Sequence, residues 1–440
     1  MIVNCFIKIY YDILIMSIKI PLNKLSKDER IYITQELQFQ KKITQYNEYM
    51  PRATVRPFEI VDDDIYLPFY WGLQHFKGRC ERLSRDNLSQ LTTSFNGELR
   101  KMQKEVKKEV LSLLNNQGSC KISLYTGAGK TILSIYLSCK IKLKTLVIVN
   151  RLILIEQWKC SIQKVCIDPK IQVLTAKNKI DKSCDFYIMN AENVSKRNRD
   201  DLSHIGFVIV DEIHLIATEK LSKSFLYTTP RYLVGLSATP VRLDGMDILL
   251  DIFFGEKKIY RKLFIPHFVF KVSTGFKPEF TLNKQGKIDW NSVLNSQAFN
   301  NERNDLILHI VQQFPERVFL ILTKRVKHGE YLVQKLQERG EDVTSLIGIK
   351  QVCNYDSRIL VATVQKAGVG FDHPRLDALL LASDVENYFI QYLGRVMRRE
   401  DSRPIIFDLV DKNSILEKHY HSRRAVYKNH GGTFKRFKKT

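Results

Sequence analysis

This sequence of 440 residues contains no cysteine pair of the C-x-x-C type, no glycine- or proline-rich repeat and no long uninterrupted apolar run. Only 12 residues are Pro and 20 are Gly, while 44% are hydrophobic, which excludes a collagen-like or wholly disordered chain. The eight Cys have no His at zinc-finger spacing, so we expect neither a disulfide framework nor a structural zinc site. Reduced and mostly buried thiols of an intracellular protein are expected instead.

The N-terminal residues 1–20 are the most apolar stretch, but Lys8, Asp12 and Lys19 interrupt it. A charged residue at the centre of a membrane helix costs roughly 2.5–3.5 kcal/mol, and no small-residue cleavage site follows. The sequence therefore predicts no membrane association. Because the chain after Met16 resembles an ordinary start, we regard residues 1–15 as a hypothetical upstream extension of the reading frame.

Acidic residues are scarce relative to basic ones. The chain has 47 Asp and Glu against 69 Lys and Arg, which gives a formal net charge of +22. Such an excess indicates a polyanionic partner, with nucleic acid as the first choice and an anionic membrane surface as the second.

The length predicts two or three domains. Short β-rich runs alternate with helical stretches from residue 99 onward, which is typical of parallel α/β sheets. An aromatic cluster at 66–76 is predicted to form an N-terminal core. The predicted parts are an N-terminal region 1–98, an α/β domain 99–262, a linker 263–297, a second α/β domain 298–411 and a basic tail 412–440.

A motif typical of phosphate-binding loops, LYTGAGKT, occurs at 124–131 between a predicted strand and a predicted helix. Its glycines let backbone N–H groups point at phosphates, Lys130 can reach the β and γ phosphates, and the Thr131 hydroxyl can ligate Mg²⁺. Leu124 departs from the general pattern, which has Gly there. The residues predicted to hold a nucleotide in this loop are Thr126, Gly127, Ala128, Gly129, Lys130 and Thr131.

A second motif, FVIVDEIH at 207–214, is an apolar strand that ends in two carboxylates. Asp211 is suited to hold Mg²⁺ through water, and Glu212 to orient and deprotonate an attacking water. In isolation the pair is more simply interpreted as acids at a helix start. Its position downstream of the phosphate loop, in the same predicted domain, favours a catalytic role.

Two further motifs follow in order. SATP at 237–240 places small hydroxyl groups after a buried strand, where they can link nucleotide state to the neighbouring domain. QYLGRVMRR at 391–399 puts Gln391, Arg395 and Arg398 near one face of a predicted helix. A solvated basic helix is the simpler interpretation of the last run, but the ordered set favours one shared site.

The order GAGKT, DEIH, SAT and Q-x-x-G-R-x-x-R resembles that of superfamily 2 helicases of the D-E-x-H type, over roughly residues 99–411. VIVNRLILIEQW (147–158) and LSATPVRLDG (236–245) are similar to the branch of XPB-like helicases and type I or III restriction translocases, with Asn150 where Pro is common. NERNDLILHIV (301–311) extends the resemblance to poxvirus transcript-release helicases and their iridovirus counterparts. The implied fold class is α/β, with two tandem RecA-like parallel-sheet domains, a small N-terminal addition and a basic C-terminal tail.

The resemblance also implies roles for residues outside the phosphate loop. LRKMQKEV (99–106) resembles the L-R-x-x-Q element, which implies that Arg100 and Gln103 lie near the adenine of ATP. VATVQKAGVGFDHP (361–374) resembles motif V. The match implies that Thr363 and Gly368 lie near the nucleic acid and Asp372 near the ribose.

The last helicase motif completes the implied catalytic site. Arg395 and Arg398 are expected to act as arginine fingers on the γ phosphate, and Gln391 to bind the nucleotide with them. Loss of the γ phosphate would then open the cleft between the two domains, and repeated cycles would move the chain along a nucleic-acid backbone.

The predicted function is that of a monomeric, ATP- and Mg²⁺-dependent DNA helicase or translocase. We expect it to act in viral transcription or DNA metabolism, in the host cytoplasm, the virion or both. Its expected partner is single-stranded or duplex DNA, with RNA as an alternative and the transcription machinery as a candidate. The open alternatives are a duplex translocase that does not separate strands, an RNA helicase, and a nucleic-acid-binding scaffold with a vestigial ATPase.

The end of the chain, residues 418–440, carries eight Lys and Arg, no acid and four interleaved aromatic residues. One interpretation is a disordered end that only improves solubility. The other is a nucleic-acid contact, because aromatic residues among cations suit base stacking beside phosphate contacts. The candidate contacts are Arg423, Arg424, Lys435 and Arg436.

Overall fold

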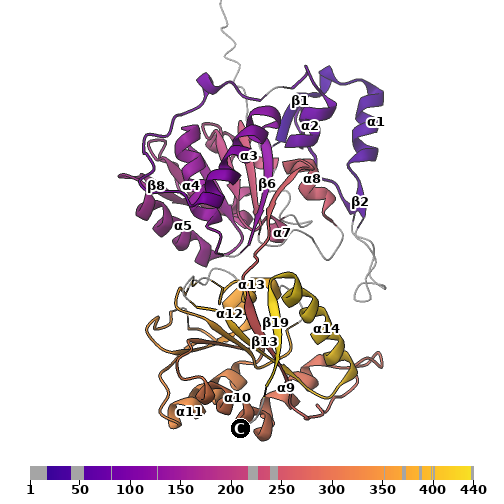
Figure 1. Cartoon of the computed structure of the whole chain (residues 1–440). Helices are drawn as coiled ribbons and strands as arrows, with labels where there is room; N and C mark the ends of the chain where they lie inside the picture. The colour runs from indigo at the N-terminus through magenta and orange to yellow at the C-terminus, as the bar shows by residue number, and fades with distance from the viewer. Residues whose placement is uncertain are drawn as a thin grey trace, which may run out of the picture. The chain divides into compact units, whose positions relative to one another are not determined.

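The computed structural model of the chain describes residues 17–40, 54–80, 82–125, 127–216, 226–237, 246–350, 352–368, 373–385, 389–397, 399 and 402–437 (Figure 1). The hypothetical extension at 1–15 lies outside these residues, as do Thr126, Asp372, Arg398 and positions 238–240 of the SATP motif. The chain forms two compact units, with the main division between Arg261 and Lys262.

The predicted fold class is confirmed, because each unit is built around a seven-stranded parallel sheet. In the first unit the strand order is β12-β6-β11-β10-β7-β9-β8, with every neighbouring pair parallel. The strands are β6 (Ser119–Leu124), β7 (Thr145–Val149), β8 (Ile171–Leu174), β9 (Phe186–Asn190), β10 (Phe207–Val210), β11 (Tyr232–Ser237) and β12 (Lys258–Arg261). The central strands are continuous apolar runs because they are buried on both faces.

Helices connect these strands and cover the sheet. They are α3 (Lys101–Gln117), α4 (Lys130–Ile141), α5 (Leu152–Val165), α6 (Ala191–Val194), α7 (Ile213–Ile216) and α8 (Ile248–Phe254). Short 3-10 turns span Leu22–Lys24, Arg85–Asn87 and Arg199–Leu202. Each parallel strand is therefore followed by a loop at its carboxyl end, and these loops carry the predicted motifs.

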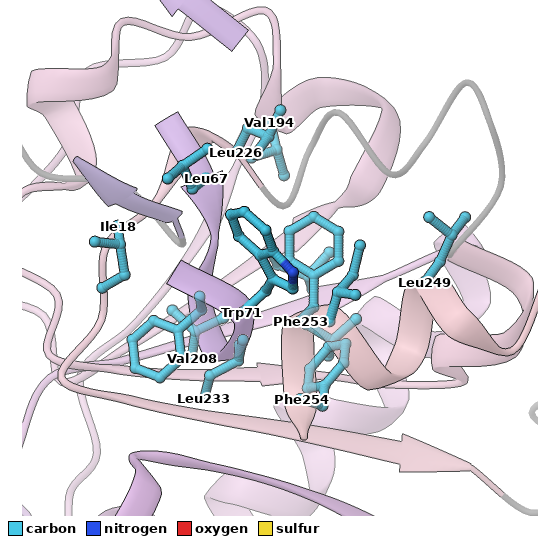
Figure 2. Packing of buried hydrophobic residues seen from close by; sticks show 14 of the residues in the cluster. Ile18, Leu67, Trp71, Val194, Val208, Leu226, Leu233, Leu249, Phe253 and Phe254 are labelled. Atoms are coloured by element: carbon cyan, nitrogen blue, oxygen red, sulfur yellow. The ribbon is translucent and has the colours of Figure 1, made fainter. Parts of the chain in front are cut away.

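The N-terminal region is a small antiparallel sheet in the order β1-β5-β4, a two-stranded ribbon and two helices. Its elements are β1 (Ser17–Pro21), α1 (Lys27–Glu36), β2 (Phe39–Gln40), β3 (Thr54–Val55), β4 (Glu59–Val61), β5 (Asp64–Pro68) and α2 (Phe69–His75). Trp71 is buried, as predicted for this aromatic cluster. Figure 2 shows it packed near Val208 and Leu233 of the first sheet and Phe253 of α8, so the N-terminal region shares one hydrophobic core with that sheet.

The second unit has the strand order β15-β16-β14-β17-β18-β13-β19, again entirely parallel. Its strands are β13 (His267–Ser273), β14 (Phe319–Thr323), β15 (Val343–Leu346), β16 (Ile359–Thr363), β17 (Ala378–Leu381), β18 (Ile405–Val410) and β19 (Gly432–Arg436). Its helices are α9 (Trp290–Phe299), α10 (Asn301–Gln313), α11 (Val326–Glu338), α12 (Val364–Gly368), α13 (Phe389–Leu393) and α14 (Ser414–Asn429). One face packs on α10 and α11, and the opposite face on α13 and α14.

Two predicted boundaries differ from this structure. Residues 263–297, predicted as a linker, contain β13, which lies inside the second sheet between β18 and β19, and also most of α9. The polar turns that follow β13 concealed its alternating apolar pattern. Residues 412–440, predicted as a tail, form α14 and β19, drawn in yellow beside β13 in Figure 1.

The physical reason for the second difference is the burial of aromatic and charged side chains. Tyr420 and Tyr427 of α14 are buried against the second sheet. Burial of large aromatic surfaces contributes strongly to stability, so these rings fix α14 to the unit. None of the helices in the described residues has both the length and the apolar composition needed to cross a bilayer.

Candidate ATP-binding and catalytic site

The phosphate loop lies between the carboxyl end of β6 and the start of α4, as predicted. Gly127 and Gly129 have φ values of 88° and 77°, in the left-handed region that favours glycine. A Cβ atom at Gly129 would lie 2.5 Å from the Gln103 Nε2 atom. The loop therefore needs glycine there, and it presents the N-terminus of a twelve-residue helix as a cradle that fits a phosphate.

Lys130 is the first residue of α4, and its Nζ atom donates a hydrogen bond of 3.0 Å to the Leu124 carbonyl oxygen. Leu124 is the last residue of β6, and its side chain is fully buried. The loop uses the main-chain carbonyl of this residue while the side chain packs in the core. Leucine in place of the usual glycine is thus compatible with the loop.

Gln103 of α3 holds the phosphate loop from the side. Its Nε2 atom donates to the carbonyl oxygens of Ala128 (3.2 Å) and Gly129 (3.1 Å), and its Oε1 atom accepts from the Arg100 N–H (2.8 Å). The side chain is 3% exposed. Sequence reasoning missed this positioning role, while the adenine contacts of Arg100 and Gln103 stay predictions.

Asp211 and Glu212 follow β10 directly, beside β7 and β11 in the sheet. The Asp211 Oδ2 atom accepts a hydrogen bond of 2.9 Å from the Trp158 Nε1–H, and Oδ1 accepts one of 3.0 Å from the Glu212 N–H. Burial raises the pKa of Asp211 to about 6, with the Glu212 charge also raising it and the Trp158 hydrogen bond and Lys130 charge opposing. These electrostatic terms bring Lys130 and the acid pair into one site.

Trp158 is a functional residue that the sequence analysis did not assign. It belongs to α5 and was noted only as the end of a motif in the resemblance. The side chain is 1% exposed, and its only polar atom donates to the predicted Mg²⁺ ligand Asp211. A tryptophan on the buried face of an otherwise aliphatic helix was the available signal, because a buried indole N–H needs an acceptor.

Glu212 has a φ of 49°, which is strained for a residue other than glycine. Such strain is often concentrated at functional sites. The Glu212 Oε2 atom lies 3.4 Å from His214 Nδ1, and His214 Nδ1 shares a hydrogen bond of 2.9 Å with Ser237 Oγ. Ser237 is the first residue of the SATP motif, so the second and third motifs meet at the ends of β10 and β11.

In the second unit the predicted residues gather around α12 and α13. Thr363 ends β16, and Gly368 ends α12. The Arg395 Nη2 atom donates to the Gly368 carbonyl oxygen at 2.9 Å, which ties the last motif to motif V. Gln391 and Arg395 are both buried.

The predicted nucleic-acid contact at Arg423 is wrong. Its guanidinium is 3% exposed and forms ion pairs with Asp408 (2.8 Å) and Asp384 (2.7 Å). The charge is neutralised inside the second unit, where it joins α14 to β18. Arg424, Lys435 and Arg436 are exposed.

The fold and the site define the class: tandem RecA-like parallel sheets, with a phosphate loop and an acid pair in the first. Among solved structures, yeast Dbp5 bound to RNA and ADP BeF3 has a TM-score of 0.54 at 14% identity. The match covers 76% of this chain and 89% of that chain, and it shows the fold alone. Residues 96–242 match the family described as type III restriction enzyme, res subunit.

Viral relatives narrow the class. The 161L protein of Invertebrate iridescent virus 6 is 42% identical over 405 residues, covering 86% of this chain and 91% of that protein. The 055L protein of Frog virus 3 is 33% identical, covering 85% and 86%. Both carry names that describe helicases. The transcript termination protein A18 of Yaba monkey tumor virus is 26% identical, covering 72% and 73%.

The chain therefore belongs to the iridovirus branch of the superfamily 2 helicases. It is an ATP-dependent helicase, as its motifs predicted.

Proposed function

We propose that this protein couples ATP hydrolysis to movement along DNA. The observation that supports it best is the meeting of Lys130 with Asp211 and Glu212 in the first unit, in a chain of helicase family. Lys130 would neutralise charge on the transferred phosphoryl group, and Glu212 would orient and deprotonate the attacking water. The strongly basic composition supports a nucleic-acid partner.

Thr131 and Asp211 are the residues that would hold Mg²⁺. The bound ion would supply charge neutralisation between the β and γ phosphates. The Asp211 carboxylate is held by two hydrogen bonds, from Trp158 and from the Glu212 backbone, and is therefore preorganised for this role. Arg100, Gln103 and the loop from Thr126 to Thr131 would bind the rest of the nucleotide.

The second unit would complete the reaction. We assign Arg395 and Arg398 as arginine fingers on the γ phosphate, and Gln391 and Asp372 as further nucleotide contacts. Thr363 and Gly368 would contact the nucleic-acid backbone. The hydrogen bond between Arg395 and the Gly368 carbonyl supports a link between the catalytic arginine and the backbone contact.

The biological setting we propose is viral transcription or DNA metabolism in the host cytoplasm or virion. The name of the Yaba monkey tumor virus relative describes transcript termination, which supports a role beside the transcription machinery. An RNA helicase is the second candidate, because a mimivirus relative at 23% identity carries the name of an ATP-dependent RNA helicase. Motifs that contact phosphates discriminate poorly between the two nucleic acids.

The test is steady-state ATP hydrolysis with duplex DNA, single-stranded DNA and RNA as competing activators. We expect slow hydrolysis alone and a clear rise with DNA, because closure of the site depends on both ligands. Glu212→Gln should bind ATP but not hydrolyse it. Activation by RNA alone would favour the second candidate, and equal rates with and without any nucleic acid would contradict the proposal.

A further inference from the structure

Three adjacent strands at one end of the second sheet carry a row of alternating cations and an aromatic ring. The strands are β18, β13 and β19, and β19 is the outermost. Phe268 of β13 lies opposite Ile405 of β18 on one side and Thr433 of β19 on the other. Its half-buried ring therefore lies in the middle of the row.

A cation approaches this ring from each neighbouring strand. The Arg403 Cζ atom, from the segment that leads into β18, lies 3.8 Å from the ring centre. The Lys435 Nζ atom of β19 lies 3.6 Å from the same centre. Arg403 Nη2 also donates to Thr433 Oγ1 at 3.3 Å, which fixes the guanidinium across the strands. Both side chains are exposed.

These two cations lack the acidic partner that neighbouring cations have. Within the described residues, no ion pair involves Arg403 or Lys435. In contrast, Lys271 of the same strand β13 pairs with Glu417 at 3.2 Å. The outer strand β12 of the first sheet likewise pairs its Arg261 with Glu109. Two like charges held beside one ring repel each other, and a bound anion would relieve that repulsion.

A simpler explanation is that charges on an outer strand prevent pairing with another chain. It accounts for Lys435, which lies on the edge strand itself. It does not account for Arg403, which comes from the far side of β13 and is held over the same ring by Thr433. The convergence of two segments on one ring indicates a built surface.

We propose that Arg403, Phe268, Thr433 and Lys435 form a phosphate-contacting surface for the nucleic acid, separate from motif V. This surface rests on the proposed function, because it needs a nucleic-acid partner. Arg403 and Lys435 each neutralise a phosphate, and the edge of the Phe268 ring contacts the sugar between them. The partner is a nucleic acid because the row alternates charge with aromatic surface.

The test measures binding of the full chain to a single-stranded DNA oligonucleotide over a range of KCl concentrations. Arg403→Gln combined with Lys435→Gln should lower the slope of log K against log salt by about 1.4–1.8, since each lost contact is worth about 0.7–0.9. The control is Lys284→Gln with Lys287→Gln, which removes the same charge from exposed residues of a turn in the same unit. Its slope should stay near that of the wild type.

A second variant separates lost contacts from misfolding. Arg403→Lys with Lys435→Arg keeps both charges and should keep the slope, and thermal unfolding should show all variants folded. A wild-type slope in the Gln variant, or an equal loss in the control, would refute the surface while the proposed function stands. Loss of binding only to a polyglutamate peptide would also refute it, in favour of an acidic protein partner. Absence of salt-dependent binding in the wild type would refute the proposed function itself.

Discussion

Replacement of Trp158 by Phe tests whether the buried indole positions the carboxylate of Asp211. The substitution keeps an aromatic ring in the core and removes the N–H group that donates to Asp211 Oδ2 at 2.9 Å. A hydrogen bond to a charged group contributes about 1.5–3 kcal/mol. We therefore expect the free energy of unfolding to fall by about that amount, with a further loss from the smaller ring.

The effect on function should exceed the effect on folding. Loss of a partner that orients a metal ligand typically lowers metal affinity about 10–100-fold. Mg²⁺ should therefore half-saturate ATP hydrolysis at a concentration at least about tenfold higher in Trp158→Phe, with much of the rate recovered at high Mg²⁺. The assay is steady-state hydrolysis at saturating ATP over a Mg²⁺ titration.

The matched control is Trp290→Phe, because Trp290 lies in α9 of the second unit beside His419. Its Mg²⁺ dependence should equal that of the wild type. A folded Trp158→Phe protein with wild-type Mg²⁺ dependence would refute the positioning role, and the hydrogen bond would then serve only the core.

Three further outcomes are expected. Gln103→Ala removes two hydrogen bonds to the phosphate loop, so the KM for ATP should rise about tenfold, with about 1–2 kcal/mol lost in urea denaturation; an unchanged KM would contradict the clamp. Arg423→Met leaves buried Asp408 and Asp384 without their cation, so denaturant unfolding should show a loss of about 3–5 kcal/mol. Wild-type stability with a weaker salt dependence of DNA binding would restore Arg423 as a nucleic-acid contact. Burial lowers the pKa of His328 from 6.5 to about 3, so only the unfolded chain takes up this proton just below pH 6.5. Stability from this group is complete above pH 6.5 and falls by about 1.4 kcal/mol per unit as the pH drops toward 3. Denaturation of His328→Gln at pH 7 and pH 5 should lack that share of the fall, and equal falls would contradict it.

The sequence predicted the strands that are buried on both faces. TLVIV, FVIV and YLVGLS match β7, β10 and β11 at both ends, because a parallel strand covered by helices on both faces is a continuous apolar run. The edge strands β8, β12 and β19 were missed, since each mixes polar and apolar residues. In β19 the basic residues masked Phe434, which packs under α14.

The candidate site was predictable where its residues are contiguous in the chain. Lys130 and the Asp211–Glu212 pair belong to short motifs whose spacing reflects a strand followed by a turn. Trp158 and Gln103 reach the site only through tertiary packing, so no local pattern marks their roles. Arg423 failed for the same reason, because its acidic partners Asp384 and Asp408 lie on other elements of the second unit.

The central claim is that Lys130 belongs to a nucleotide site that drives nucleic-acid-dependent hydrolysis. The most direct measurement is the ATP hydrolysis rate of Lys130→Ala beside the wild type, with and without DNA. We predict a wild-type rate that rises with DNA and no hydrolysis by the variant under either condition, because the charge on the transferred phosphoryl group is lost. Near-wild-type turnover by a folded Lys130→Ala protein would contradict the account.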